Sequence, residues 1–255
     1  MPMPPETQQL IEQALTTVRN DPQHTLNLYQ RFAIYYSFGN SRYLSVGYSK
    51  DGNESNFAEW DKVLEEEFAH PSPVDFALGW LAILSAKKVQ PVWEKVWKQI
   101  APDKYKKFLG KGAFANSLQS CEKLLLRQLT YQEGADLFYE ITYWVLQDAK
   151  HGVTYDIASA YQTLYDAIGY ALIGPLPRGQ IVVEGKLPEN IFIADPAYSA
   201  GEAYSTIDEN VLGEGNWNPP PKPIKYDLSK RLEFWEWWLT EAIPQAWELT
   251  EINSK

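Results

Sequence analysis

The 255-residue sequence has few of the side chains on which disulfide-bonded and metal-binding proteins depend. It contains one cysteine, Cys121, which excludes an intrachain disulfide and a cysteine-based zinc cluster. Its three histidines, His24, His70 and His151, stand far apart and form no HExxH or similar ligand pair. We therefore expect neither a metal ion nor a cofactor.

Long apolar runs are missing as well. No stretch of about 18 apolar residues occurs, and residues 1–10 lack the basic and apolar regions of a secretory signal. From these absences we expect a cytoplasmic protein that does not enter a membrane.

Signatures of catalysis are also absent. No GxSxG elbow, Walker loop or GxGxxG motif follows a predicted strand. The sequence therefore lacks the motifs on which nucleophilic catalysis, phosphoryl transfer and dinucleotide binding commonly depend. Cys121 lies in residues 118–129, where apolar residues recur at helical spacing, which predicts a buried small side chain and not a nucleophile. We expect no catalytic residues.

What the chain does have is an excess of acid, with a formal net charge of -10. Nucleic acid and anionic membranes repel such a protein, so we expect neither as a partner. The same charge suits a basic protein partner. The alternative is that the surplus acid serves solubility alone.

Aromatic residues are abundant, with 10 tryptophans and 16 tyrosines, and residues 232–247 hold four of the tryptophans. Five side chains of this stretch share one side of a helix with about 100° per residue: Trp235, Trp238, Leu239, Ala242 and Ala246. The stripe predicts a helix that faces the core. Trp237 lies nearly opposite, which indicates either a second packing contact or an exposed anchor for a partner.

Four residues of this helix lie off the apolar stripe and are candidates for contact with a partner: Glu233, Glu236, Trp237 and Glu241. Glutamates attract a basic surface, and tryptophan is enriched among the residues that dominate binding energy. The alternative is an ordinary solvated helix face.

Helical periodicity recurs through most of the chain. Helices are predicted over residues 4–19, 24–39, 56–70, 72–103, 118–129, 130–152, 154–174, 195–207 and 232–247. Polar start signals support three of them, at Ser72 with Asp75, at Thr130 with Glu133, and at Asp195 before Pro196.

Residues 175–230 differ, because proline and glycine cluster there. Two short runs, 180–185 and 190–194, indicate a β-hairpin, and residues 216–226 are typical of a polyproline connector. A short strand or loop is predicted over 42–56. The expected fold is therefore mainly all-α, a single multi-helical globular domain over 1–255 with an irregular insertion or small β-hairpin at 175–230.

Three stretches of the chain resemble the Imm5 family of immunity proteins from bacterial polymorphic toxin systems. Residues 81–112 are similar to its alanine-lysine-valine, proline and tryptophan-glutamate segment, residues 195–204 to its aspartate-led, alanine-rich element, and residues 230–247 to its closing tryptophan-rich run. The resemblance implies a mainly helical protein that binds and neutralises a cognate toxin without turnover. A nuclease toxin has a basic cleft, which an acidic inhibitor would cover.

Two other classes stay open from the residues alone. A carbohydrate-active protein needs two carboxylates and aromatic rings for sugar stacking, and a small-molecule-binding helical protein needs an apolar pocket. Neither has a dedicated motif in this sequence.

Overall fold

A computed structural model describes residues 2–39, 65–66, 68–100, 112–148, 154–173, 177–178, 192–193, 195–207 and 224–253. Helices account for most of them: α1 (Pro5–Asn20), α2 (Leu28–Ser37), α5 (Pro73–Ile100), α7 (Ala113–Leu125), α8 (Tyr131–Asp148), α9 (Tyr155–Ile173), α10 (Pro196–Ser205), α11 (Leu228–Trp237) and α12 (Ile243–Asn253). The prediction of a mainly all-α, multi-helical globular fold is confirmed.

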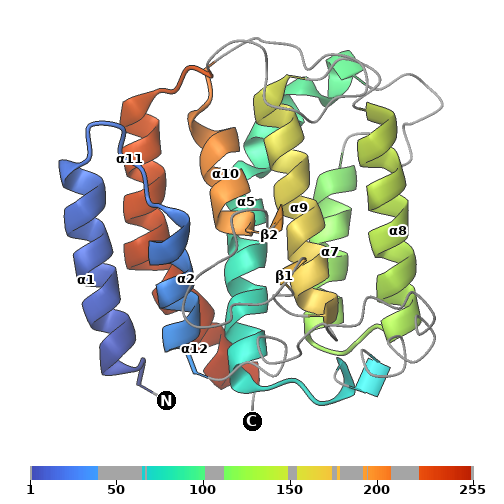
Figure 1. Ribbon diagram of the computed structural model, residues 1–255. Coiled ribbons are helices and arrows are strands. Elements are labelled where there is room, and N and C mark those ends of the chain that lie inside the picture. Colours follow the sequence, from blue (N-terminus) through green and yellow to red (C-terminus); the bar gives the residue numbers. More distant parts are fainter. Residues whose placement is uncertain are drawn as a thin grey trace, which may run out of the picture.

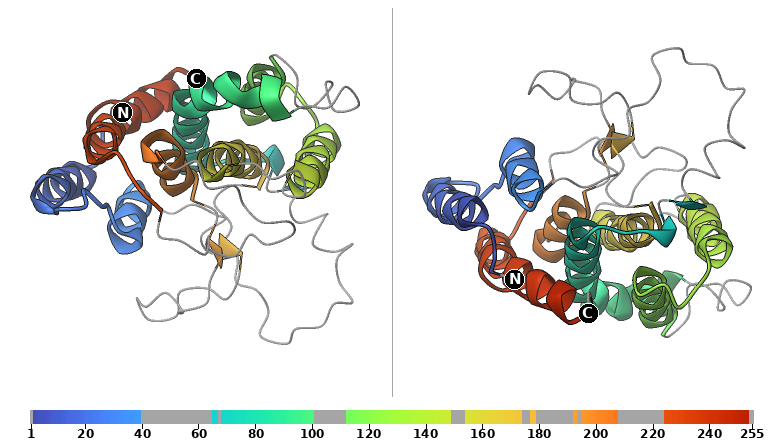
Figure 2. Two further views of the ribbon diagram at one scale, coloured as in Figure 1. Left: turned by 90° about the horizontal axis from the view of Figure 1, so that it is seen from above. Right: turned by 90° about the horizontal axis from the view of Figure 1, so that it is seen from below.

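The helices stand side by side in two layers, as Figures 1 and 2 show. One layer consists of α5, α7 and the α11–α12 pair, and the other of α2, α9 and α10, with α1 and α8 at the two ends. The central helices α5 and α9 pack against each other, and α10 packs against both. This position of α10 matters below, because α10 joins the core to α11.

Reciprocal hydrogen bonds between side chain and backbone begin two of the long helices. Before α5, the Ser72 N–H donates to Asp75 Oδ2 at 2.7 Å, and the Asp75 N–H donates to Ser72 Oγ at 3.2 Å. Thr130 and Glu133 form the same capping box before α8, with distances of 2.7 and 3.2 Å. These bonds satisfy amide groups that the first helical turn leaves without partners. Both predicted start signals are confirmed.

Part of α5 is buried on every side, beyond the single apolar stripe that helical periodicity predicts. Residues 77–86 of α5 are buried without interruption, as a central helix requires, and α5 continues through Pro91 as one helix. Cys121 is fully buried in α7, and burial raises the pKa of its thiol well above the ordinary value. The thiol therefore keeps its proton and packs as a small apolar group, as predicted.

The C-terminal helix buries its predicted stripe, since Trp235 is 2% exposed and Trp238 is fully buried. It is not a uniform α-helix, however. A π-helical stretch, η4 (Trp238–Ala242), separates α11 from α12, and the Ile243 N–H donates to the carbonyl of Trp238. Pro244 explains this, because a proline ring in an α-helix clashes with the carbonyl four residues earlier, and a wider turn gives the ring room.

Between α9 and α10, β1 (Pro177–Arg178) pairs in antiparallel register with β2 (Phe192–Ile193). β2 falls within the predicted run 190–194. The other predicted run, 180–185, lies outside the described residues. So do 42–56, residues 216–223 of the predicted connector, and most of the helix predicted over 56–70. The assignment of the chain to one domain stays a prediction.

None of the helices in the described ranges combines the length and the apolar character needed to cross a membrane. The expected cytoplasmic location stays a prediction.

Candidate partner-binding surface

Two buried carboxylates lie on one face of α10, seven residues apart and therefore two turns from each other. Asp195 caps the N-terminus of the helix and is 4% exposed, and Glu202 is 2% exposed. An uncompensated charge at either place would be costly, because burial removes its hydration. Each carboxylate in fact faces an arginine from a different helix.

The first arginine is Arg31 of α2. Its Nε donates to Asp195 Oδ2 at 2.6 Å, and its Nη1 donates to the carbonyl of Leu26. The Tyr35 hydroxyl donates to Asp195 Oδ1 at 3.2 Å. Burial, together with the Asp195 carboxylate, raises the pKa of Tyr35 well above the ordinary value, so its hydroxyl keeps the proton that this bond needs. The contacts tie α2 to the start of α10.

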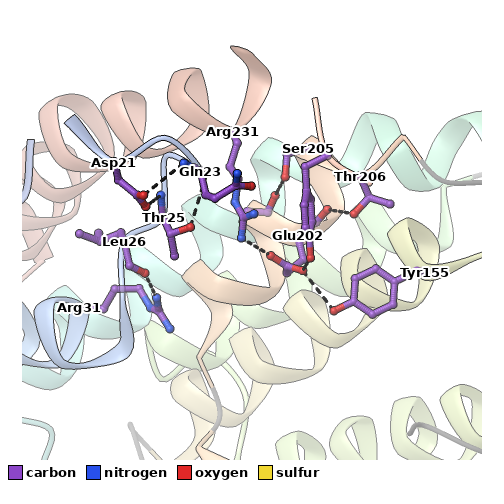
Figure 3. Close-up of polar contacts among 12 residues, drawn as sticks. Asp21, Gln23, Thr25, Leu26, Arg31, Tyr155, Glu202, Ser205, Thr206 and Arg231 are labelled. Atoms are coloured by element: carbon purple, nitrogen blue, oxygen red, sulfur yellow. Dashed lines mark hydrogen bonds and ion pairs between the residues drawn. The ribbon is translucent and has the colours of Figure 1, made fainter. Parts of the chain in front are cut away.

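The second arginine is Arg231 of α11, and Figure 3 shows it facing the Glu202 carboxylate. Arg231 Nη2 donates to Glu202 Oε1 at 2.9 Å, while the hydroxyls of Tyr155 and Tyr226 donate to Oε2 at 3.2 and 2.5 Å. Burial, followed by the Glu202 carboxylate, raises the pKa of both tyrosines above their ordinary value. Glu202 thus joins α9, α10 and α11.

The contacts around Asp195 and those around Glu202 fit a structural role better than a role in acid–base chemistry. A general acid or base must reach a reacting group, whereas both carboxylates are buried and accept several internal hydrogen bonds. The tryptophans whose side chains the structure describes do not provide an open aromatic floor either: Trp80, Trp93, Trp235, Trp238 and Trp247 are buried, and Trp237 is partly buried.

The predicted contact residues Glu233 and Trp237 lie one turn apart on α11, beside Lys88 of α5. Lys88 Nζ is 4.8 Å from the centre of a Trp237 ring and 3.9 Å from Glu233 Oε1. The ring of Trp237 also lies 5.6 Å from that of Phe234. Trp237 therefore makes the second packing contact that the helical wheel left open, and part of its surface stays accessible.

Tyr204 of α10 completes this group. Its hydroxyl donates to Glu233 Oε1 at 2.5 Å, and its ring centre is 5.0 Å from Lys88 Nζ. We call Lys88, Tyr204, Glu233 and Trp237 the Lys88 cage. Its members come from the three stretches that carry the resemblance, residues 81–112, 195–204 and 230–247, which the fold brings to one place on the surface.

The other two predicted contact residues lie apart from the Lys88 cage. Glu236 Oε1 accepts a hydrogen bond from Arg19 Nε of α1 at 2.7 Å, and Glu241 is exposed on η4. Arg19, Lys88 and Tyr204 were missed at the sequence level, because no local pattern on α1, α5 or α10 indicates which residues of α11 they contact.

The described ranges contain no group of three or more His, Cys, Asp or Glu side chains placed to hold a metal ion. Two of the histidines bond to nearby backbone: His24 Nδ1 lies 2.9 Å from the carbonyl of Val18, and His70 Nδ1 lies 3.1 Å from that of Glu66. His151 lies outside the described residues.

No family model matches the chain, and no curated protein matches it. The similarity to Imm5 proteins therefore rests on the three sequence stretches alone and stays a prediction.

Proposed function

We propose that this protein is an immunity protein that binds a cognate toxin and neutralises it by protein–protein contact, without turnover. One observation carries the proposal: aromatic and acidic side chains gather at the surface of α10 and α11, while the interior carboxylates of α10 are paired with arginines. A partly exposed tryptophan surrounded by polar side chains is typical of a protein interface.

Charge favours a basic partner. The net charge of -10 would draw a basic toxin domain, such as a nuclease, toward the protein before any specific contact forms. The partner would then cover Trp237 and Glu233, with Glu236 and Glu241 at the edges of the contact. Its active cleft would be closed by the same contact, so that no catalytic group is needed.

The partner to test is any toxin domain that is encoded beside the gene for this chain. We expect the association rate to fall at least about ten-fold between low and high salt, because salt screens the attraction between unlike charges. A rate that does not change with salt would remove the electrostatic part of the proposal. Absence of any binding would remove the immunity function itself.

A Trp237→Ala variant tests the contact surface. We expect it to raise the dissociation constant for the toxin at least about ten-fold, as for an aromatic residue that anchors an interface. The loss in the free energy of unfolding should be smaller than the loss in the free energy of binding. Tyr139→Ala is the matched control, because Tyr139 is 71% exposed and belongs to α8, a helix that lies across the molecule from α11 (Figure 1). Equal losses of binding energy and stability in Trp237→Ala would assign Trp237 to the core alone.

A further inference from the structure

Lys88 occupies a site that has the chemistry of an ammonium-binding cage. Its Nζ lies 4.8 and 5.0 Å from the ring centres of Trp237 and Tyr204, with a carboxylate oxygen of Glu233 at 3.9 Å. Two aromatic faces attract a cation through their negative charge density, and the carboxylate adds an opposite charge. Proteins recognise quaternary ammonium ligands and methylated lysine with cages of aromatic side chains.

The walls of the Lys88 cage are held by contacts that do not involve Lys88. The Tyr204 hydroxyl donates to Glu233 at 2.5 Å, and the ring of Phe234 lies 6.0 Å from that of Tyr204 and 5.6 Å from that of Trp237. Gly201 allows α10 and α11 to approach closely, because a Cβ there would lie 3.1 Å from the Trp235 ring. The site would therefore keep its shape if the cation left.

Lys88 itself is weakly attached. Its 3.9 Å distance to Glu233 is too long for a hydrogen bond, and its ammonium donates none to another residue of the described ranges. The side chains of Lys88 and Glu233 are 23% and 57% exposed, so water reaches the pair. The preceding residue, Lys87, differs clearly, since its Nζ lies 2.5 Å from Glu122 Oε1.

We propose that the Lys88 cage is a binding site for a primary ammonium group, which Lys88 fills in the free protein and a lysine side chain of the basic partner fills in the complex. On exchange, the ammonium of Lys88 moves into water, and the partner's lysine takes its place between Trp237 and Tyr204 and beside Glu233. The identity of the partner rests on the proposed function, whereas the chemistry of the cage does not.

A small cation tests the cage without any partner. Lys88→Ala removes the part of the side chain that propylammonium replaces, so we expect propylammonium to bind this variant saturably. The reporter is the ¹⁹F resonance of Trp237 in protein labelled with 5-fluorotryptophan, assigned as the signal that Trp237→Phe lacks. We expect the wild-type protein to need at least about ten times more ligand, and uncharged 1-propanol to have no such effect. If the Trp237 resonance showed no saturable shift, or shifted equally with 1-propanol, the proposed ammonium-binding site would be refuted.

Partner affinity tests the exchange. We expect Lys88→Ala to bind the toxin domain at least about three-fold more tightly than Lys87→Ala, which makes the same change in charge outside the cage. Lys88→Gln against Lys87→Gln repeats the comparison with side chains closer in size to lysine, in case the alanine variant folds poorly. Equal or weaker binding by the Lys88 variants would refute the exchange.

The two experiments separate the two proposals. If neither the wild-type protein nor any variant binds the toxin domain, the immunity function and the exchange fail together. The propylammonium titration still decides whether the Lys88 cage binds an ammonium group.

Discussion

The neighbouring helices α10 and α11 each carry two carboxylates that face cations, and the two pairs differ in burial. On α10, the side chains of Asp195 and Glu202 are 5% and 2% exposed, with arginine nitrogens at 2.6 and 2.9 Å. On α11, those of Glu233 and Glu236 are 57% and 36% exposed, with cations at 3.9 and 2.7 Å. Distance alone does not separate the two helices.

Burial is what separates them. Arg19 lies about as close to Glu236 as Arg31 does to Asp195, yet water and salt screen the first pair and not the second. When a buried charge loses its ion-pair partner, no water takes the partner's place, whereas an exposed charge becomes hydrated. We therefore assign the carboxylates of α10 to the stability of the fold, whereas those of α11 are accessible to the partner that we propose.

The largest expected effect comes from breaking a buried pair. Arg31→Met should lower the free energy of unfolding by about 3–5 kcal/mol, because Asp195 stays buried without its arginine. Arg19→Met, the matched change at the surface, should cost less than about 1 kcal/mol. Urea unfolding of both variants measures the difference, and similar values would contradict the contrast drawn between α10 and α11.

Double-mutant cycles sharpen the same contrast. The cycle of Arg231→Met with Glu202→Gln should give a coupling energy of about 2–3 kcal/mol, because the two side chains share a buried contact. The cycle of Lys88→Met with Glu233→Gln should give less than about 1 kcal/mol. Unfolding free energies of the single and double variants supply both numbers. A coupling energy above about 1 kcal/mol between Lys88 and Glu233 would show that Lys88 is firmly attached, which would contradict the proposed exchange.

The smallest expected effect is a change in the titration of Tyr204. Partial burial, followed by the hydrogen bond to Glu233, raises the pKa of Tyr204 from 10.0 to about 12. The bond therefore contributes fully to stability below pH 10, and the contribution is lost as the pH rises toward 12. Glu233→Gln should lower the Tyr204 pKa toward its ordinary value, because it removes the carboxylate that opposes ionisation.

Ring ¹³C chemical shifts of labelled tyrosine follow this titration, with Tyr204→Phe for assignment. Glu236→Gln is the control, since it makes the same change in charge beside Arg19 and should leave the Tyr204 pKa where it is. If both glutamine variants lowered it equally, general surface charge and not the hydrogen bond would be the cause.

The helices and most of their buried faces could be predicted from the sequence, because the signals that specify them are local. A capping box such as Thr130 with Glu133 joins residues within one turn, and the stripe containing Trp235 and Trp238 repeats every three or four residues. The π-helical stretch before Pro244 also has a local cause, but a wheel drawn with uniform α-helical spacing does not reveal it.

Only the tertiary structure decided which charges meet. Arg31 and Asp195 lie 164 positions apart, and no spacing in the sequence indicates that α2 would reach the start of α10. A helical wheel likewise places Trp237 opposite the core, whereas α5 and α10 bring Lys88 and Tyr204 to its side. Periodicity describes one helix about its own axis, and contacts between helices depend on how their surfaces pack.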